Sequence, residues 1–267
     1  GLVCPSTPTL VVKGEDVRRQ PAFRWRNSRC MGNAYGLTQA IWGNPPPREV
    51  QQFARRMRYG GTAYACNHSF YRYYERFWEE DSPHFEGKKP EYFARGYSGK
   101  PPQLCYTNPG LIQQIVSDAR STFDGKPPYG ALASGDFFGL VPMDNSQYCT
   151  CDACREAIAR STDTNPYFST GTHSEYVFEF INRVAREVAK THPGKTLSAL
   201  SYAKYAFRPE TVTLEPNVSI QMCVHARNWW APGMETNDMA FYREWVEKEK
   251  GRRMLVWLYY CFPELLT

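Results

Sequence analysis

The feature that most constrains the fold of this 267-residue chain is a repeated alternation of strand-like runs with helical patterns. Seven runs have the length and the β-branched or aromatic content of strands: 22–27, 61–66, 102–108, 136–145, 195–202, 217–225 and 253–260. Helical patterns separate most of them. After the third run, for example, Asn108 can cap a helix that begins at Pro109. Strands that alternate with helices predict a mostly parallel sheet.

Seven such units favour a (β/α)8 TIM barrel over an open doubly wound sheet. No glycine-rich phosphate-binding turn follows the first strand, and the long loops come after the strands. We expect two irregularities in this α/β fold. Residues 203–216 are too few for an ordinary crossover helix after strand five, and the eighth unit is missing because the chain stops just after strand seven. The prediction is a barrel domain over residues 21–267, truncated at its C-terminus.

The amino-acid composition limits the classes of molecule that the protein is expected to bind. The net charge of +5 is mild and the basic residues are scattered, so nucleic acid is not indicated. No stretch approaches the length of a membrane span. Aromatic residues make up 15% of the chain, and many fall in loop-like stretches. Exposed aromatic rings suit stacking on sugars, although a large core also uses such residues.

In a parallel barrel, active sites form at the carboxyl ends of the strands, which converts position along a strand into a role. The polar and aromatic side chains that follow the predicted strands form a lining typical of a sugar site. The candidate substrate-binding residues are Arg24, Arg26, His68, Tyr106, Asn108, Tyr202, His225 and Trp229.

Two carboxylates lie at predicted strand ends. Asp144 follows an apolar strand and stands beside Asn145, so it can act as an acid, a base or a polarising group, or it can cap the next turn. Glu264, just beyond Pro263, is the second candidate, and the alternative for it is a solvated side chain near a frayed terminus. Asp144, Asn145 and Glu264 are the candidate catalytic residues.

Three cysteines follow closely in the pattern Cys149-x-Cys151-x-x-Cys154. This spacing suits zinc or a tight disulfide, but a structural zinc site needs a fourth ligand, for which Cys66, Cys105 and His68 are candidates. A single C-x-C-x-x-C run is weaker evidence than paired knuckles, so we favour a disulfide or free buried thiols that brace the loop. We expect no cofactor, with zinc as the minority interpretation.

Eight segments together resemble a bacterial family long catalogued as a domain of unknown function, some members of which are classed as glycoside hydrolase family 163. These enzymes are endo-beta-N-acetylglucosaminidases that act on N-glycans. The chain is also similar to the alpha-glucuronidase and hexosaminidase barrels. The segments that carry the resemblance are PAFRWR, NHSF, PEYF, QLCYTNP, VPMDNSQYCTCDAC, FINRVAREV, LSYAKY and EPNVSIQMC.

The resemblance implies a barrel catalytic domain, a glycan substrate and export to the periplasm, the cell surface or the medium. It also implies a small domain before the barrel, of which residues 1–20 would be a remnant or linker. In related hexosaminidases an Asp-Glu pair ends strand four: the Asp holds the substrate acetamido N–H while the acetamido oxygen attacks, and the Glu protonates the leaving oxygen. Here the pair reads Asp144-Asn145. Either Asp144 is the acid and Asn145 orients the acetamido group, or the acid is another carboxylate such as Glu264.

The sequence therefore predicts a retaining, substrate-assisted glycoside hydrolase that acts on N-acetylglucosamine-containing glycans. One alternative is a non-catalytic glycan-binding barrel, because the Glu of strand four is missing. Another is an alpha-glucuronidase-like hydrolase, in which Arg24 and Arg26 would pair with a uronate carboxylate. The linkage cleaved and the oligomeric state are left open.

Overall fold

The computed structural model describes residues 25–26, 48–56, 58–61 and 64–259. By its contacts the chain divides into two compact units, Gly1–Ala63 and Tyr64–Thr267. The predictions for Arg24 and Glu264 lie outside the described residues. The expected boundary at residue 20 stays a prediction.

In the first unit, β1 (Trp25–Arg26) pairs with β2 (Gly60–Gly61) in antiparallel register, and α2 (Arg48–Arg56) lies between them in sequence. The Arg26 guanidinium lies 5.8 Å from the centre of the Tyr59 ring. The two first predicted strands are thus much shorter than expected where they are described. They also run antiparallel, unlike neighbouring strands of a barrel.

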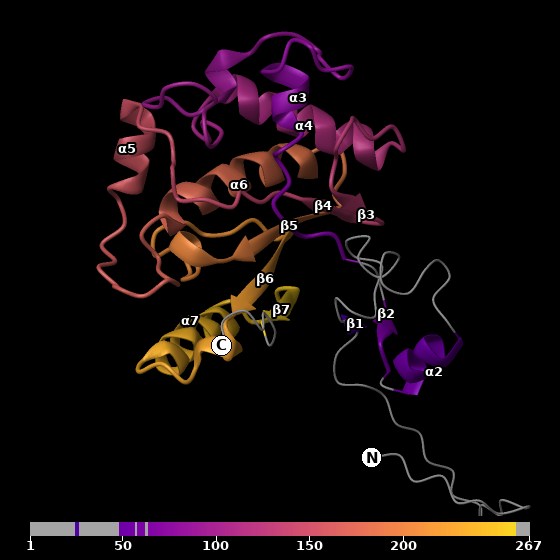
Figure 1. The fold of residues 1–267 in the computed structure, drawn as a ribbon, viewed down its shortest axis with the longest axis vertical. Coiled ribbons are helices and arrows are strands. Elements are labelled where there is room, and N and C mark those ends of the chain that lie inside the picture. The colour runs from indigo at the N-terminus through magenta and orange to yellow at the C-terminus, as the bar shows by residue number, and fades with distance from the viewer. Residues whose placement is uncertain (1–24, 27–47, 57, 62–63, 260–267) are drawn as a thin grey trace, which may run out of the picture. The chain divides into compact units, whose positions relative to one another are not determined.

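The second unit is built on a five-stranded mixed sheet with the order β3-β4-β5-β6-β7 (Figure 1). The first pair is antiparallel and the other three pairs are parallel. The strands are β3 (Ala133–Ser134), β4 (Phe137–Gly139), β5 (Thr196–Ser201), β6 (Val218–Val224) and β7 (Met254–Leu258). The parallel strands confirm an α/β fold. In the described part of the chain they form an open row and not a closed barrel.

Helices cover one face of this sheet. α6 (Ser174–Ala189) packs on β5 and β6 and also contacts α4 (Pro109–Phe123), and α7 (Met234–Lys248) packs on β6 (Figure 1). As predicted, α4 begins at Pro109, and the Asn108 side chain accepts a hydrogen bond of 2.8 Å from the amide of Leu111. No helix among the described residues is long and apolar enough to cross a membrane.

Shorter helices complete the unit. They are α3 (Tyr73–Phe77), α5 (Asp152–Ile158) and three 3-10 turns, η1 (Pro90–Tyr92), η2 (Ala203–Tyr205) and η3 (Ala226–Asn228). Only η2 lies between β5 and β6, so the predicted absence of a crossover helix there is confirmed. The predicted strand over 102–108 is wrong: this segment is irregular and makes one antiparallel bridge, between Leu104 and Phe93.

An irregular segment crosses the other face of the sheet. Ser198 of β5 and Ser219 of β6 are register partners, so their side chains share a face. The Ser198 hydroxyl donates to the carbonyl of Ala65, and the Tyr64 hydroxyl lies 3.1 Å from the Ser219 hydroxyl. Residues that the sequence assigns to the second strand therefore lie over this face without joining the sheet.

Candidate functional site

The carboxyl ends of the parallel strands bring four predicted site positions to one edge of the sheet. Asp144 follows β4, Tyr202 follows β5 and His225 follows β6, and His68 joins them from the segment that crosses the sheet. Parallel strands end at the same edge, so side chains from distant parts of the sequence meet there. We call His68, Asp144, Tyr202 and His225 the strand-end cluster.

Asp144 is the exposed centre of this cluster. Its side chain is 53% exposed, yet it is held on two sides: His68 Nε2 lies 3.5 Å from Oδ1, and the Tyr202 hydroxyl donates to the same oxygen over 3.2 Å. The pKa of Tyr202 is raised, first by burial and then by the negative charge of Asp144. Tyr202 therefore stays neutral and donates to the carboxylate throughout the physiological pH range.

The orientation of His68 follows from its other nitrogen. Nδ1 lies 2.5 Å from the carbonyl oxygen of Pro142, and a carbonyl can only accept, so Nδ1 carries a hydrogen. Nε2 is then the nitrogen that faces Asp144. A backbone contact thus fixes the ring so that Nε2 of His68 points at the one exposed carboxylate of the cluster.

Aromatic rings line the rest of the edge. The His225 ring stacks on Tyr259 at 4.7 Å with an interplanar angle of 9°, and Phe168 contacts both His225 and Tyr202 edge-on. Burial lowers the pKa of His225 to about 4, and the nearby Arg227 charge adds to the effect. His225 is therefore neutral near pH 7. Since Phe168 is 49% exposed, this edge offers an open apolar surface beside the carboxylate.

Two of the predicted site residues form hydrogen bonds within the protein. Asn145 donates from Nδ2 to the carbonyl of Pro102 over 2.9 Å, and its Oδ1 accepts from the amide of Gln147 over 3.0 Å. Both ends of its amide are occupied, which leaves little capacity to orient a substrate. Trp229 is half-buried and donates from its indole to Asp238 over 3.1 Å.

Two other predicted residues of the second unit do not reach the cluster. Tyr106 is 1% exposed and donates to Gln103 within the core, and Asn108 caps α4. Both lie in the 102–108 segment, which the sequence misassigned to a strand. Arg26 lies in the first unit, beside Tyr59.

The structure also adds residues that sequence reasoning missed. The Tyr71 hydroxyl accepts a hydrogen bond of 2.9 Å from the amide of Asp144, and Phe168 and Tyr259 complete the aromatic lining. Tyr71 belongs to the aromatic-rich run 68–78, whose composition was a signal of an exposed ring near a site. Phe168 lies in a loop with no pattern that points to it.

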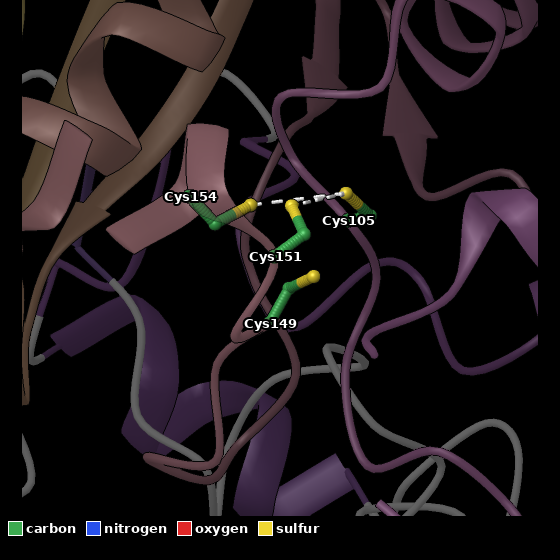
Figure 2. Close-up of side chains that lie close together, drawn as sticks. All are labelled: Cys105, Cys149, Cys151 and Cys154. Atoms are coloured by element: carbon green, nitrogen blue, oxygen red, sulfur yellow. Dashed lines mark hydrogen bonds between the residues drawn. The ribbon is translucent and has the colours of Figure 1, made fainter. Parts of the chain in front are cut away.

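A second cluster takes three of its four residues from the part of the chain just after Asp144. Cys149, Cys151 and Cys154 meet Cys105, and the four sulfur atoms all lie within 4.8 Å of one another (Figure 2). We call these four residues the cysteine cluster. Cys151 directly precedes α5 and Cys154 lies in its first turn. Of the three residues that could have supplied a fourth ligand, the structure selects Cys105; Cys66 lies beside Tyr64 and Ser198 instead, and His68 faces Asp144.

Hydrogen bonds from Cys105 and Cys154 lower the pKa of the Cys149 thiol, while the pKa of Cys154 is raised by bonds to Cys105 and Cys149. The thiols of Cys105, Cys149 and Cys154 thus share their protons as a group. Polar groups surround them: the Arg95 amide donates to Cys149 over 3.3 Å, and Thr107 Oγ1 lies 3.1 Å from the Cys154 sulfur. This donor set fits a thiophilic metal ion.

Comparison with known proteins gives one positive result. No curated protein and no solved structure matches the chain significantly. A family model matches residues 1–265, which is nearly the whole chain. This match confirms the resemblance to a domain family of unknown function. The chain belongs to the family described as Domain of unknown function (DUF4838).

Proposed function

We propose that this protein is a glycoside hydrolase acting on N-acetylglucosamine-containing glycans, with Asp144 as its central carboxylate. The observation that carries the proposal is the setting of Asp144: more than half exposed, faced by His68 Nε2 and the Tyr202 hydroxyl, beside exposed aromatic surface at the carboxyl edge of parallel strands. Sugar sites combine stacking surface with a few convergent polar groups.

We further propose that the parallel strands are part of a (β/α)8 barrel related to glycoside hydrolase family 163 and the hexosaminidases. Support comes from the three consecutive parallel pairs, from helices on one face, and from the crossing of Tyr64–Cys66 over the other face, where a barrel has its interior. The family likeness supports export to the periplasm, the cell surface or the medium.

In the proposed reaction, Asp144 accepts a hydrogen bond from the acetamido N–H of the substrate. The acetamido oxygen then attacks the anomeric carbon as the glycosidic bond breaks, and the leaving oxygen takes a proton. Water later opens the cyclic intermediate, so the enzyme needs no nucleophile of its own. Because Asn145 is tied to the loop, the proton comes from elsewhere. His68 Nε2 is the described group best placed to hold it, and Glu264 remains a predicted donor.

The test replaces Asp144 and uses its counterpart at the other end of the same strand as a control. Asp144→Asn should lower kcat/KM on a complex N-glycan by about 10³-fold or more, because a central catalytic group is lost. Asp136, just before β4, is similarly exposed and pairs with Lys195 over 2.6 Å, so Asp136→Asn should leave the rate unchanged. Undiminished turnover by Asp144→Asn would exclude this mechanism.

A non-catalytic glycan-binding protein is the second candidate. The occupied amide of Asn145 favours it, because the Asp-Asn pair then presents one free polar group and not the two that related hexosaminidases use. Glycan binding by calorimetry without product after long incubation would support this alternative. Turnover confined to uronic-acid substrates would instead support the alpha-glucuronidase-like alternative.

A further inference from the structure

We propose that the cysteine cluster binds one zinc ion, held by the four sulfur atoms of Cys105, Cys149, Cys151 and Cys154 as a closed structural site. The proposal concerns the stability of the second unit and does not depend on the glycan hypothesis. It assigns a function to a motif that the strand-end cluster leaves unused.

The spacing of the sulfur atoms carries the first step. Cys105 Sγ lies 3.8 Å from Cys151 Sγ and 3.7 Å from Cys154 Sγ (Figure 2). Zinc–sulfur bonds of about 2.3 Å in a tetrahedron place the sulfurs about 3.8 Å apart. The two distances therefore match tetrahedron edges, and the limit of 4.8 Å on all pairs leaves room for a single metal ion only. A multi-iron cluster would need more widely spaced cysteines.

The same distances argue against disulfides. A disulfide bond is about 2.05 Å long, and its formation requires each cysteine to have one preferred partner. Cys105 is almost equally close to Cys151 and Cys154, and all four thiols are free. An arrangement with equivalent neighbours is typical of shared coordination.

The surroundings suit thiolates. Three of the four cysteines are at most 5% exposed, and a buried thiolate requires hydrogen bonds or a cation. The Arg95 amide lies 3.3 Å from Cys149, and the hydroxyls of Thr107 and Tyr176 lie 3.1 and 3.3 Å from Cys154. Such outer contacts orient the ligands of a metal site.

Four protein ligands leave no open position for substrate, so the site is structural and not catalytic. Binding would replace four S–H bonds with four Zn–S bonds and release up to four protons, with no change of oxidation state. The metal would join the 102–108 segment to the loop that runs from Asp144 into α5. Neither segment is held by the sheet, which explains why a clip is useful there.

The experiment measures metal in the full chain, produced with zinc in the medium and purified without chelators. Elemental analysis should give about one zinc per chain. Cys105→Ser should lower the zinc content or affinity at least tenfold, whereas Cys223→Ser should keep it, because Cys223 is a free buried cysteine of β6 outside the cluster.

A second measurement applies to the parent protein and holds even if Cys105→Ser fails to fold. Titration with an organomercurial should release about one zinc as four thiols react, read with a zinc-sensitive dye. The proposal is overturned by metal-free protein whose cluster cysteines are found in disulfides by mass spectrometry, by one iron per chain in place of zinc, or by equal zinc loss in the Cys223→Ser control.

Discussion

Asp144 of the strand-end cluster and three members of the cysteine cluster lie close together in the sequence after β4, yet their environments are opposite. Asp144 has a side chain that is 53% exposed, whereas Cys154, ten positions later, is 0% exposed. The groups around Asp144 leave one side of its carboxylate open to solvent. The groups around Cys154 close over it. The residues after β4 therefore provide an exposed surface that can bind a ligand. A few positions later they provide buried side chains that can hold this surface in place.

Gln103 links the two regions, and replacing it is expected to have the largest effect on the stability of the protein. Fully buried, it donates to the carbonyls of Met143 and Asn145 over 2.7 and 3.1 Å, and its oxygen accepts from the Met143 amide over 3.2 Å. It therefore holds the backbone on both sides of Asp144 to the segment that carries Cys105.

Gln103→Leu should destabilise the protein by roughly 2–4 kcal/mol in urea unfolding, because it leaves buried backbone groups unpaired. It should also lower glycan turnover or binding. Metal content should be retained, since no ligand changes. Gln113→Leu, at an exposed position of α4, is the matched control and should be silent. An equally stable Gln103→Leu protein would show that the two regions are not coupled through this residue.

The buried His225 of the strand-end cluster should make the free energy of unfolding depend on pH in the acid range. The folded pKa of His225 is about 4, against about 6.5 in an unfolded chain, so between these values the unfolded state binds more protons. Stability should fall as the pH drops from about 6.5 to about 4, by an amount on the order of 2 kcal/mol from this residue.

The measurement is the free energy of unfolding against pH for the parent and His225→Gln. Acid also protonates thiolates, but both proteins keep the cysteine cluster, so the difference between the two curves isolates His225. His84→Gln makes the same exchange at an exposed histidine and is the matched control for the substitution itself. If the free energy of unfolding changed equally with pH in the parent and in His225→Gln between pH 6.5 and 4, burial would not lower the pKa of His225 as described.

The smallest effect is expected for Tyr202, the residue that donates a hydrogen bond to Asp144. Tyr202→Phe removes the donor to Asp144 and should lower kcat/KM about tenfold, or about 1.4 kcal/mol, with stability changed by less than about 0.5 kcal/mol. Tyr129→Phe removes a hydroxyl that donates to Glu75 over 2.6 Å, another carboxylate partner, and should leave turnover unchanged. A larger loss of stability than of activity at Tyr202 would place this residue with the structural region.

The parts of the fold that the sequence predicted well are those with local signals. The cap at Asn108 and the proline after it located α4, and the long apolar runs located β5 and β6. The segment 102–108 was misassigned because Leu104 and Tyr106 are apolar and buried, and burial in an irregular segment gives the same signal as burial in a strand.

The candidate site was predicted in part for a similar reason. Asp144, Tyr202 and His225 meet because parallel strands end at one edge, a rule that can be applied from sequence alone. His68 reaches the same edge from an irregular segment that the sequence assigned to a strand. The engagement of Asn145 with Pro102 and the choice of Cys105 as fourth cysteine depend on how the 102–108 segment is placed beside the β4 loop. No local pattern specifies that placement.

The order of the four cysteines along the chain has a consequence for biosynthesis. Cys105 precedes the other three by more than forty residues, yet all four are complete at residue 154, before α6, β5, β6 and β7 have been made. Chains are synthesised from the N-terminus and tend to fold in that order. A zinc ion bound early in folding would close the Cys105–Cys154 stretch and present a pre-formed surface on which the later strands assemble.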